Sequence, residues 1–117
     1  MALFASEVAS LEEPRIAAAL AASADESQPI AGGVMARSAP GSWTNHAVGL
    51  CMDREITGAE VQRLIAFYEE RGIEPRVEAC SLAHESLLRE LGAAGFRLKS
   101  MEGVMARRLT PGESIRA

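Results

Sequence analysis

The chain contains no apolar segment long enough to cross a membrane. Its longest uninterrupted apolar run, residues 16–22, is rich in alanine and far shorter than the roughly 20 residues that a spanning helix needs. An excess of basic residues is also lacking. The formal net charge of -4 gives no reason to expect a nucleic-acid partner, because phosphate binding requires a basic surface. No basic-then-apolar signal peptide opens the chain, so we expect a cytoplasmic protein.

Cysteine is scarce, with Cys51 and Cys80 as the two examples. In a chain without an export signal we expect free thiols in a reducing compartment rather than a disulfide. Together with His46 and His84 they offer four ligands of the kind that zinc accepts. His46 and Cys51, however, are an odd number of positions apart on a predicted strand and would face opposite sides of it. We therefore expect no metal site.

A chain of 117 residues is typical of one domain and is long enough to bury a modest core. Hydrophobic residues make up 48% and charged residues 24%, which is ordinary for a globular protein. We expect a single domain, with an N-terminal helix and loop over residues 1–31, a core over residues 32–109 and a tail or linker over residues 110–117.

The strongest helical pattern begins at Thr57, which forms a T-x-x-E capping box with Glu60. Arg71 is expected in the last turn of this helix, and Gly72 is typical of the left-handed residue that ends one. Apolar residues recur between these ends at helical spacing. They are Val61, Leu64, Ile65 and Tyr68.

Two further helices are predicted on weaker patterns. Residues 11–23 follow Ser10, a favourable N-cap, and place Pro14 in the first turn. The second follows Ser81, another candidate N-cap. Its predicted apolar face consists of Leu82, Leu87, Leu88 and Leu91.

Strands are predicted from apolar or alternating segments bounded by turn residues. A polar loop over residues 24–29 and a turn-rich loop over residues 39–45 separate the first elements. The predicted strands are residues 33–38, 46–52, 76–80, 96–100 and 104–109.

Short motifs follow one another in a fixed order between residues 33 and 109, about two-thirds of the chain. This order resembles the GNAT family, the acyl-CoA-dependent N-acetyltransferases. In particular, it resembles the N-terminal GNAT-like region of a longer bacterial acetyltransferase. The residues that carry the resemblance are Trp43, Asn45, Val48-Gly49-Leu50, Thr57, Glu60, Arg71-Gly72, Gly95-Phe96 and Arg108-Leu109.

The resemblance implies an α/β (α+β) fold, with a mixed, largely antiparallel sheet flanked by about three helices. It also implies that acetyl-CoA is bound by a second GNAT domain, which lies either in the same chain or in a partner chain. A homodimer is the alternative assembly.

GNAT enzymes hold the pyrophosphate of the cofactor in a Q/R-x-x-G-x-G/A loop between a strand and a helix, where backbone N–H groups face the anion. The sequence has a literal match from Arg89 to Ala94, but it lies at the end of a predicted helix, where the helix dipole disfavours an anion. Gly92 and Gly95 are better interpreted as helix-stop residues. We therefore expect this chain to bind no cofactor itself.

Two residues of the loop over residues 39–45 are predicted to contact substrate, Trp43 and Asn45. A tryptophan outside any periodic element either covers the core or contacts a binding partner. Asn45 has the alternative role of closing the turn.

Other chemistry rests on single residues, and we assign no catalytic residue. Cys80 with His84 nearby is a candidate nucleophile, although a buried, inert thiol is the more common case. Glu78 and Glu85 are candidate general bases, but lone glutamates are usually solvated surface residues.

Three functions remain open at this point. The first is a GNAT-like domain of an N-acetyltransferase that supports acceptor binding or a catalytic domain. The second is a small α/β module that self-associates through a sheet edge, with Val34, Val104 and Met105 on the pairing strands. The third is a stand-alone acetyltransferase.

Overall fold

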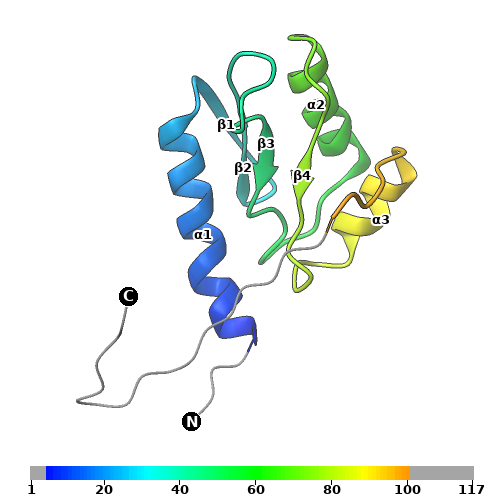
Figure 1. Ribbon diagram of the computed structural model, residues 1–117. Helices are drawn as coiled ribbons and strands as arrows, with labels where there is room; N and C mark the ends of the chain where they lie inside the picture. Colours follow the sequence, from blue (N-terminus) through cyan, green and yellow to red (C-terminus); the bar gives the residue numbers. More distant parts are fainter. Residues whose placement is uncertain (1–4, 101–117) are drawn as a thin grey trace, which may run out of the picture.

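The computed structural model describes residues 5–100, which form a mixed α/β structure (Figure 1). Within this range the strands assemble into one four-stranded sheet in the order β1-β2-β3-β4, in which β1, β2 and β3 are antiparallel and β4 is parallel to β3. The mixed, largely antiparallel sheet expected from the sequence is thus confirmed. The elements are α1 (Ala5–Ser23), β1 (Glu26–Ile30), β2 (Gly33–Arg37), β3 (His46–Val48), α2 (Gly58–Glu69), β4 (Val77–Glu78) and α3 (Ser86–Ala93).

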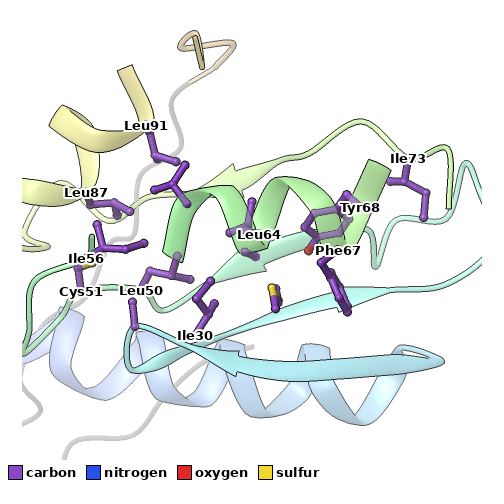
Figure 2. Close-up of a cluster of buried hydrophobic side chains, with 14 residues drawn as sticks. Ile30, Leu50, Cys51, Ile56, Leu64, Phe67, Tyr68, Ile73, Leu87 and Leu91 are labelled. Carbon is purple, nitrogen blue, oxygen red and sulfur yellow. The ribbon is translucent and has the colours of Figure 1, made fainter. Parts of the chain in front are cut away.

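The two faces of the sheet carry separate cores, because side chains alternate along each strand. Val34 and Val48 pack with Leu20 of α1 on one face. Met35 and Ala47 point the other way and belong to the larger core, to which α2 and α3 contribute (Figure 2). The sheet is therefore the middle layer, with α1 on one side and the other two helices on the opposite side (Figure 1).

The capping box at the start of α2 is confirmed. The Thr57 hydroxyl accepts the Glu60 backbone N–H, and the Glu60 carboxylate accepts the N–H of Thr57 at 3.1 Å. The helix ends at Glu69, so Arg71 lies just beyond the last turn instead of within it. Gly72 has a φ of 69°, the left-handed conformation expected of it.

The segment predicted as a polar loop over residues 24–29 is largely a strand. β1 pairs with β2 along its full length, from Glu26 opposite Arg37 to Ile30 opposite Gly33. It is an edge strand with an exposed, polar face and a proline, Pro29, so its sequence lacks the alternation of a buried strand. The hairpin closes at Ala31 and Gly32, both with positive φ.

Several predicted bounds were wrong. β3 ends at Val48 because Gly49 (φ 78°) and Cys51 (φ 62°) turn the chain, and β4 has two residues rather than five. Residues 96–100 form no strand, and the strand predicted over residues 104–109 and the tail over residues 110–117 lie outside the described residues.

The predicted starts of α1 and α3 were also wrong. α1 begins at Ala5, so Ser10 is not its N-cap and Pro14 lies inside the helix. α3 begins at Ser86, so Ser81 does not cap it. Leu82 precedes the helix and is exposed, and Leu88 lies on the exposed side of it, whereas Leu87 and Leu91 are buried as predicted.

Candidate functional site

The connection between β2 and β3 is held together by the side chain of Asn45. Its Oδ1 accepts the Ser38 backbone N–H at 2.7 Å, and its Nδ2 donates to the Ala39 carbonyl oxygen at 2.9 Å. Asn45 is 7% exposed and spans the turn from within. The structure therefore places Asn45 in the turn-closing role that the sequence left open.

Trp43 lies in the same connection but points into solvent. Its side chain is 71% exposed, so it does not cover the core. The residues around it are fixed, since buried Thr44 places its hydroxyl 2.6 Å from that of Ser38 and 2.9 Å from that of Ser42. The loop thus presents an exposed indole on an ordered backbone. Residues that anchor an interface are often tryptophans held in this way.

A cleft of about 230 Å³ adjoins this connection. Its lining residues come from the α1–β1 connection, from β1 and the end of β2, and from the segments that follow β2 and α2. The residues that line it are Asp25, Glu26, Arg37, Ser38, Ala39, Pro40 and Arg71.

Arg37 is the buried base of this cleft, with 6% of its surface exposed. Its guanidinium donates to Glu26 at 2.7 Å, to Glu70 and to the backbone carbonyl oxygen of Phe67, and it stacks 4.1 Å above the centroid of the Phe67 ring. Its Nε has no hydrogen-bond partner among the described residues. Arg37 therefore joins β1, β2 and the C-terminal end of α2, where a cation complements the helix dipole.

Glu26 bridges two guanidiniums. One carboxylate oxygen accepts from Arg37, and the other accepts from Arg71 at 3.0 Å. The hydrogen bond from Arg37 holds the pKa of the Glu26 carboxyl below its ordinary value, and nearby positive charge acts in the same direction. This network was not predicted from the sequence. The signal was present, because Glu26 and Arg37 are directly opposite once residues 26–30 are recognised as a strand.

His84 does not activate Cys80. Its Nδ1 accepts the Ser86 backbone N–H at 3.1 Å and lies 3.0 Å from the Ser86 hydroxyl, while its Nε2 is 3.6 Å from the Glu55 carboxylate. This is the order of a serine, histidine and carboxylate triad, but Ser86 is fully buried and its hydroxyl accepts the Ile56 N–H at 3.0 Å. A substrate cannot reach it, so the group is a structural link between α3 and the β3–α2 connection.

The two thiols form no disulfide. Burial raises the pKa of Cys51, with the Glu60 carboxylate adding to the effect. Cys80 hydrogen-bonds the carboxylate of Glu13, a residue whose pKa is raised by burial. Within residues 5–100 there is no group of three or more histidine, cysteine, aspartate or glutamate residues placed to hold a metal ion.

The candidate general bases have no shared site. Glu78 lies on β4, with its carboxylate 3.6 Å from His46 Nε2. Glu85 is the N-cap of α3 and makes no side-chain capping bond. The structure brings neither one to the cleft.

The N-terminus of α2 carries an acidic residue and a basic partner. Glu60 occupies the first turn, where Arg54 pairs with it at 3.1 Å. A Cβ added at Gly58 would lie 3.4 Å from the Glu90 carboxylate of α3, so a second acid is close. The literal pyrophosphate motif from Arg89 to Ala94 lies at the C-terminal end of α3, as predicted.

Comparisons with known proteins found no matching family model, no matching curated protein and no matching solved structure. Among the helices in the described part of the chain, none is sufficiently long and apolar to pass through a membrane.

Proposed function

We propose that this chain is a GNAT-like domain of a cytoplasmic N-acetyltransferase that does not itself bind acetyl-CoA. Its role is to support acceptor binding or a catalytic domain, with Trp43 as the contact residue. The acetyl-CoA of the reaction is then bound by a second GNAT domain, in the same chain or in a partner chain.

The order of the elements carries this proposal. Antiparallel strands β2 and β3 are followed by the T-x-x-E helix α2, then by β4 parallel to β3, then by the short helix α3. Just beyond the end of α3, Gly95 has a φ of 93°. This is the order that the resemblance implies up to Phe96. Parallel pairing of β3 and β4 requires a crossover connection, and α2 supplies it.

The electrostatics at the start of α2 support the absence of cofactor binding. A pyrophosphate group needs free backbone N–H groups at a helix N-terminus. Here Thr57 and Glu60 bond to each other's backbone N–H, and the carboxylate of Glu60 in the first turn of the helix repels an anion. The strand-to-helix connection between β3 and α2 is therefore chemically unsuited to a phosphate.

Calorimetric titration tests this proposal. With acetyl-CoA and, separately, with inorganic pyrophosphate, we expect no binding up to about 1 mM, which corresponds to about -4 kcal/mol. Micromolar binding of acetyl-CoA would overturn the proposal in favour of a stand-alone acetyltransferase.

Tryptophan fluorescence tests whether Trp43 is a contact residue, because Trp43 is the one tryptophan of the chain. Addition of an acetyl-CoA-binding GNAT domain that this chain supports should move the tryptophan emission to shorter wavelength, as the indole leaves water. Binding that leaves the emission unchanged would show that Trp43 lies outside the contact.

A self-associating module is the second candidate, favoured by the unpaired outer side of β4 among the described strands. The prediction that Val34 lies on a strand at the sheet edge was wrong. Val34 lies on β2, which is paired on both sides. Val104 and Met105 lie outside the described residues. Sedimentation equilibrium separates the candidates, since only the module forms a dimer without a second protein.

A further inference from the structure

The outer side of β4 is one border of the described sheet (Figure 1). The Ala47 N–H donates to the Arg76 carbonyl oxygen at 2.9 Å, so Arg76 turns its backbone groups toward β3. Backbone groups alternate in direction along a strand, so those of the next residue, Val77, point away from β3. No strand of the described sheet pairs with them. The N–H and carbonyl oxygen of Val77 are therefore the groups through which another strand can add.

The side chains that flank Val77 carry opposite charges. Arg76 precedes it and Glu78 follows it, with 62% and 57% of their side chains exposed. They lie on the same face of the strand, because they are two positions apart. Their nearest charged neighbours, Glu74 and His46, are 3.7 Å and 3.6 Å away, beyond hydrogen-bond distance. Both side chains can therefore form closer ion pairs with an added strand.

The segment Arg76-Val77-Glu78 is complementary to itself when two copies run in opposite directions. With Val77 opposite Val77, each valine donates its N–H to the carbonyl oxygen of the other, which is the hydrogen-bonded pair of an antiparallel ladder. The same register places Arg76 of each copy opposite Glu78 of the other, and opposite charges in facing positions stabilise a sheet. A parallel pairing in the same register would place like charges opposite each other.

We propose that β4 pairs antiparallel with β4 of a second copy of this chain, about a two-fold axis at Val77. The inference rests on the second candidate function, the self-associating module, and adds to it the strand, the register and the two ion pairs. A two-fold contact uses the same border in both copies. Since β4 is short, we expect a weak dimer with a dissociation constant on the order of 100 μM.

Charge reversal tests the register. Arg76→Glu places acids opposite acids in its own dimer, and Glu78→Arg places bases opposite bases. Each variant alone should associate about tenfold more weakly than the original chain, whereas an equimolar mixture of the two should recover association, because every facing pair is then of opposite charge. Arg89→Glu is the matched control, since Arg89 lies on α3, is 60% exposed and makes the same change in net charge. It should leave the dimer unchanged.

Sedimentation equilibrium of the full chain up to about 1 mM makes these measurements. Recovery in the mixture supports the register and also shows that both variants are folded. A chain that stays monomeric up to this concentration overturns the proposal together with the self-associating module. A dimer that neither variant weakens, or a mixture that associates no better than either variant alone, overturns the β4 register and leaves self-association through another surface. The acetyl-CoA titration is independent of all these outcomes.

Discussion

The phenol oxygen of Tyr68 accepts a hydrogen bond from the backbone N–H of Ala36 at 3.1 Å. Tyr68 belongs to α2 and is fully buried, while Ala36 is the fourth residue of β2. The bond therefore ties the crossover helix to the sheet through a group that water does not reach. Burial raises the pKa of Tyr68 well above its ordinary value.

Replacement of this tyrosine tests the bond directly. Tyr68→Phe keeps the ring, which meets Phe67 edge-on at a centroid distance of 5.1 Å, but leaves the buried Ala36 N–H without its acceptor. We expect a loss of about 1–3 kcal/mol in the free energy of unfolding, measured by urea denaturation. A variant as stable as the original chain would mean that the bond contributes nothing net.

Tyr68 should also make the free energy of unfolding fall at high pH. Tyrosine in an unfolded chain ionises near a pKa of about 10, whereas folded Tyr68 keeps its proton to higher pH. The folded state therefore holds more protons above about pH 10, and the free energy of unfolding should fall as pH rises beyond that point. Stability measured between pH 8 and 11 should show this fall, and Tyr68→Phe should reduce its slope.

The ion pairs of Glu26 predict the opposite dependence in acid. Arg37 lowers the pKa of Glu26 in the folded protein, so the stabilisation is present above the ordinary carboxyl pKa of about 4.3 and is lost as pH falls below it. Glu26→Gln should therefore flatten the acid side of the stability profile. Glu69→Gln, an exposed residue with no ion pair in the described part of the chain, is the control and should leave the profile unchanged.

His84 provides the N-terminal hydrogen bond that α3 lacks from its N-cap residue. His84→Ala removes the acceptor of the Ser86 N–H and should lower the free energy of unfolding by about 1 kcal/mol, the usual effect of losing a cap. His84→Asn supplies another acceptor at this position and should recover part of the loss. Thermal unfolding of both variants makes the comparison, and equal losses would contradict the capping role.

Gly33 is required by the close approach of β2 to the end of β3. A Cβ at this position would lie 2.4 Å from the Val48 carbonyl oxygen and 2.5 Å from the Gly49 carbonyl carbon. Gly33→Ala should cost about 3 kcal/mol, because backbone atoms must move. Gly92→Ala is the matched control in α3, where a Cβ meets no atom within 4 Å, and it should stabilise the helix by about 1 kcal/mol. Urea denaturation of the two variants measures both changes in the free energy of unfolding.

Features that depend on neighbouring residues were predictable from the sequence. The capping box of Thr57 and Glu60 and the stop at Gly72 involve contacts within a few positions, so the pattern of residues indicates them. Features that depend on partners distant in the sequence were missed. β1 becomes a strand by pairing with β2, and nothing in its own residues indicates that pairing.

The same distinction holds for the candidate site. The loop with Trp43 and Asn45 was identified from its turn residues, and the role of Asn45 in the turn was among the expectations. The cleft was missed because Asp25, Arg37 and Arg71 meet only after the hairpin has formed and α2 has packed on the sheet. The start of α3 was misplaced because a histidine, which is not a typical capping residue, provides the bond.

Pro29 makes the outer side of β1 a poorer template for pairing with another strand. It has no N–H to offer, and its carbonyl oxygen is bonded to Arg63, so the β1 border presents no backbone donor or free carbonyl at this residue. In the described sheet, the remaining border is the outer side of β4. A strand that added to the β1 side would therefore lose a backbone bond at Pro29, whereas neither described residue of β4, Val77 or Glu78, is a proline.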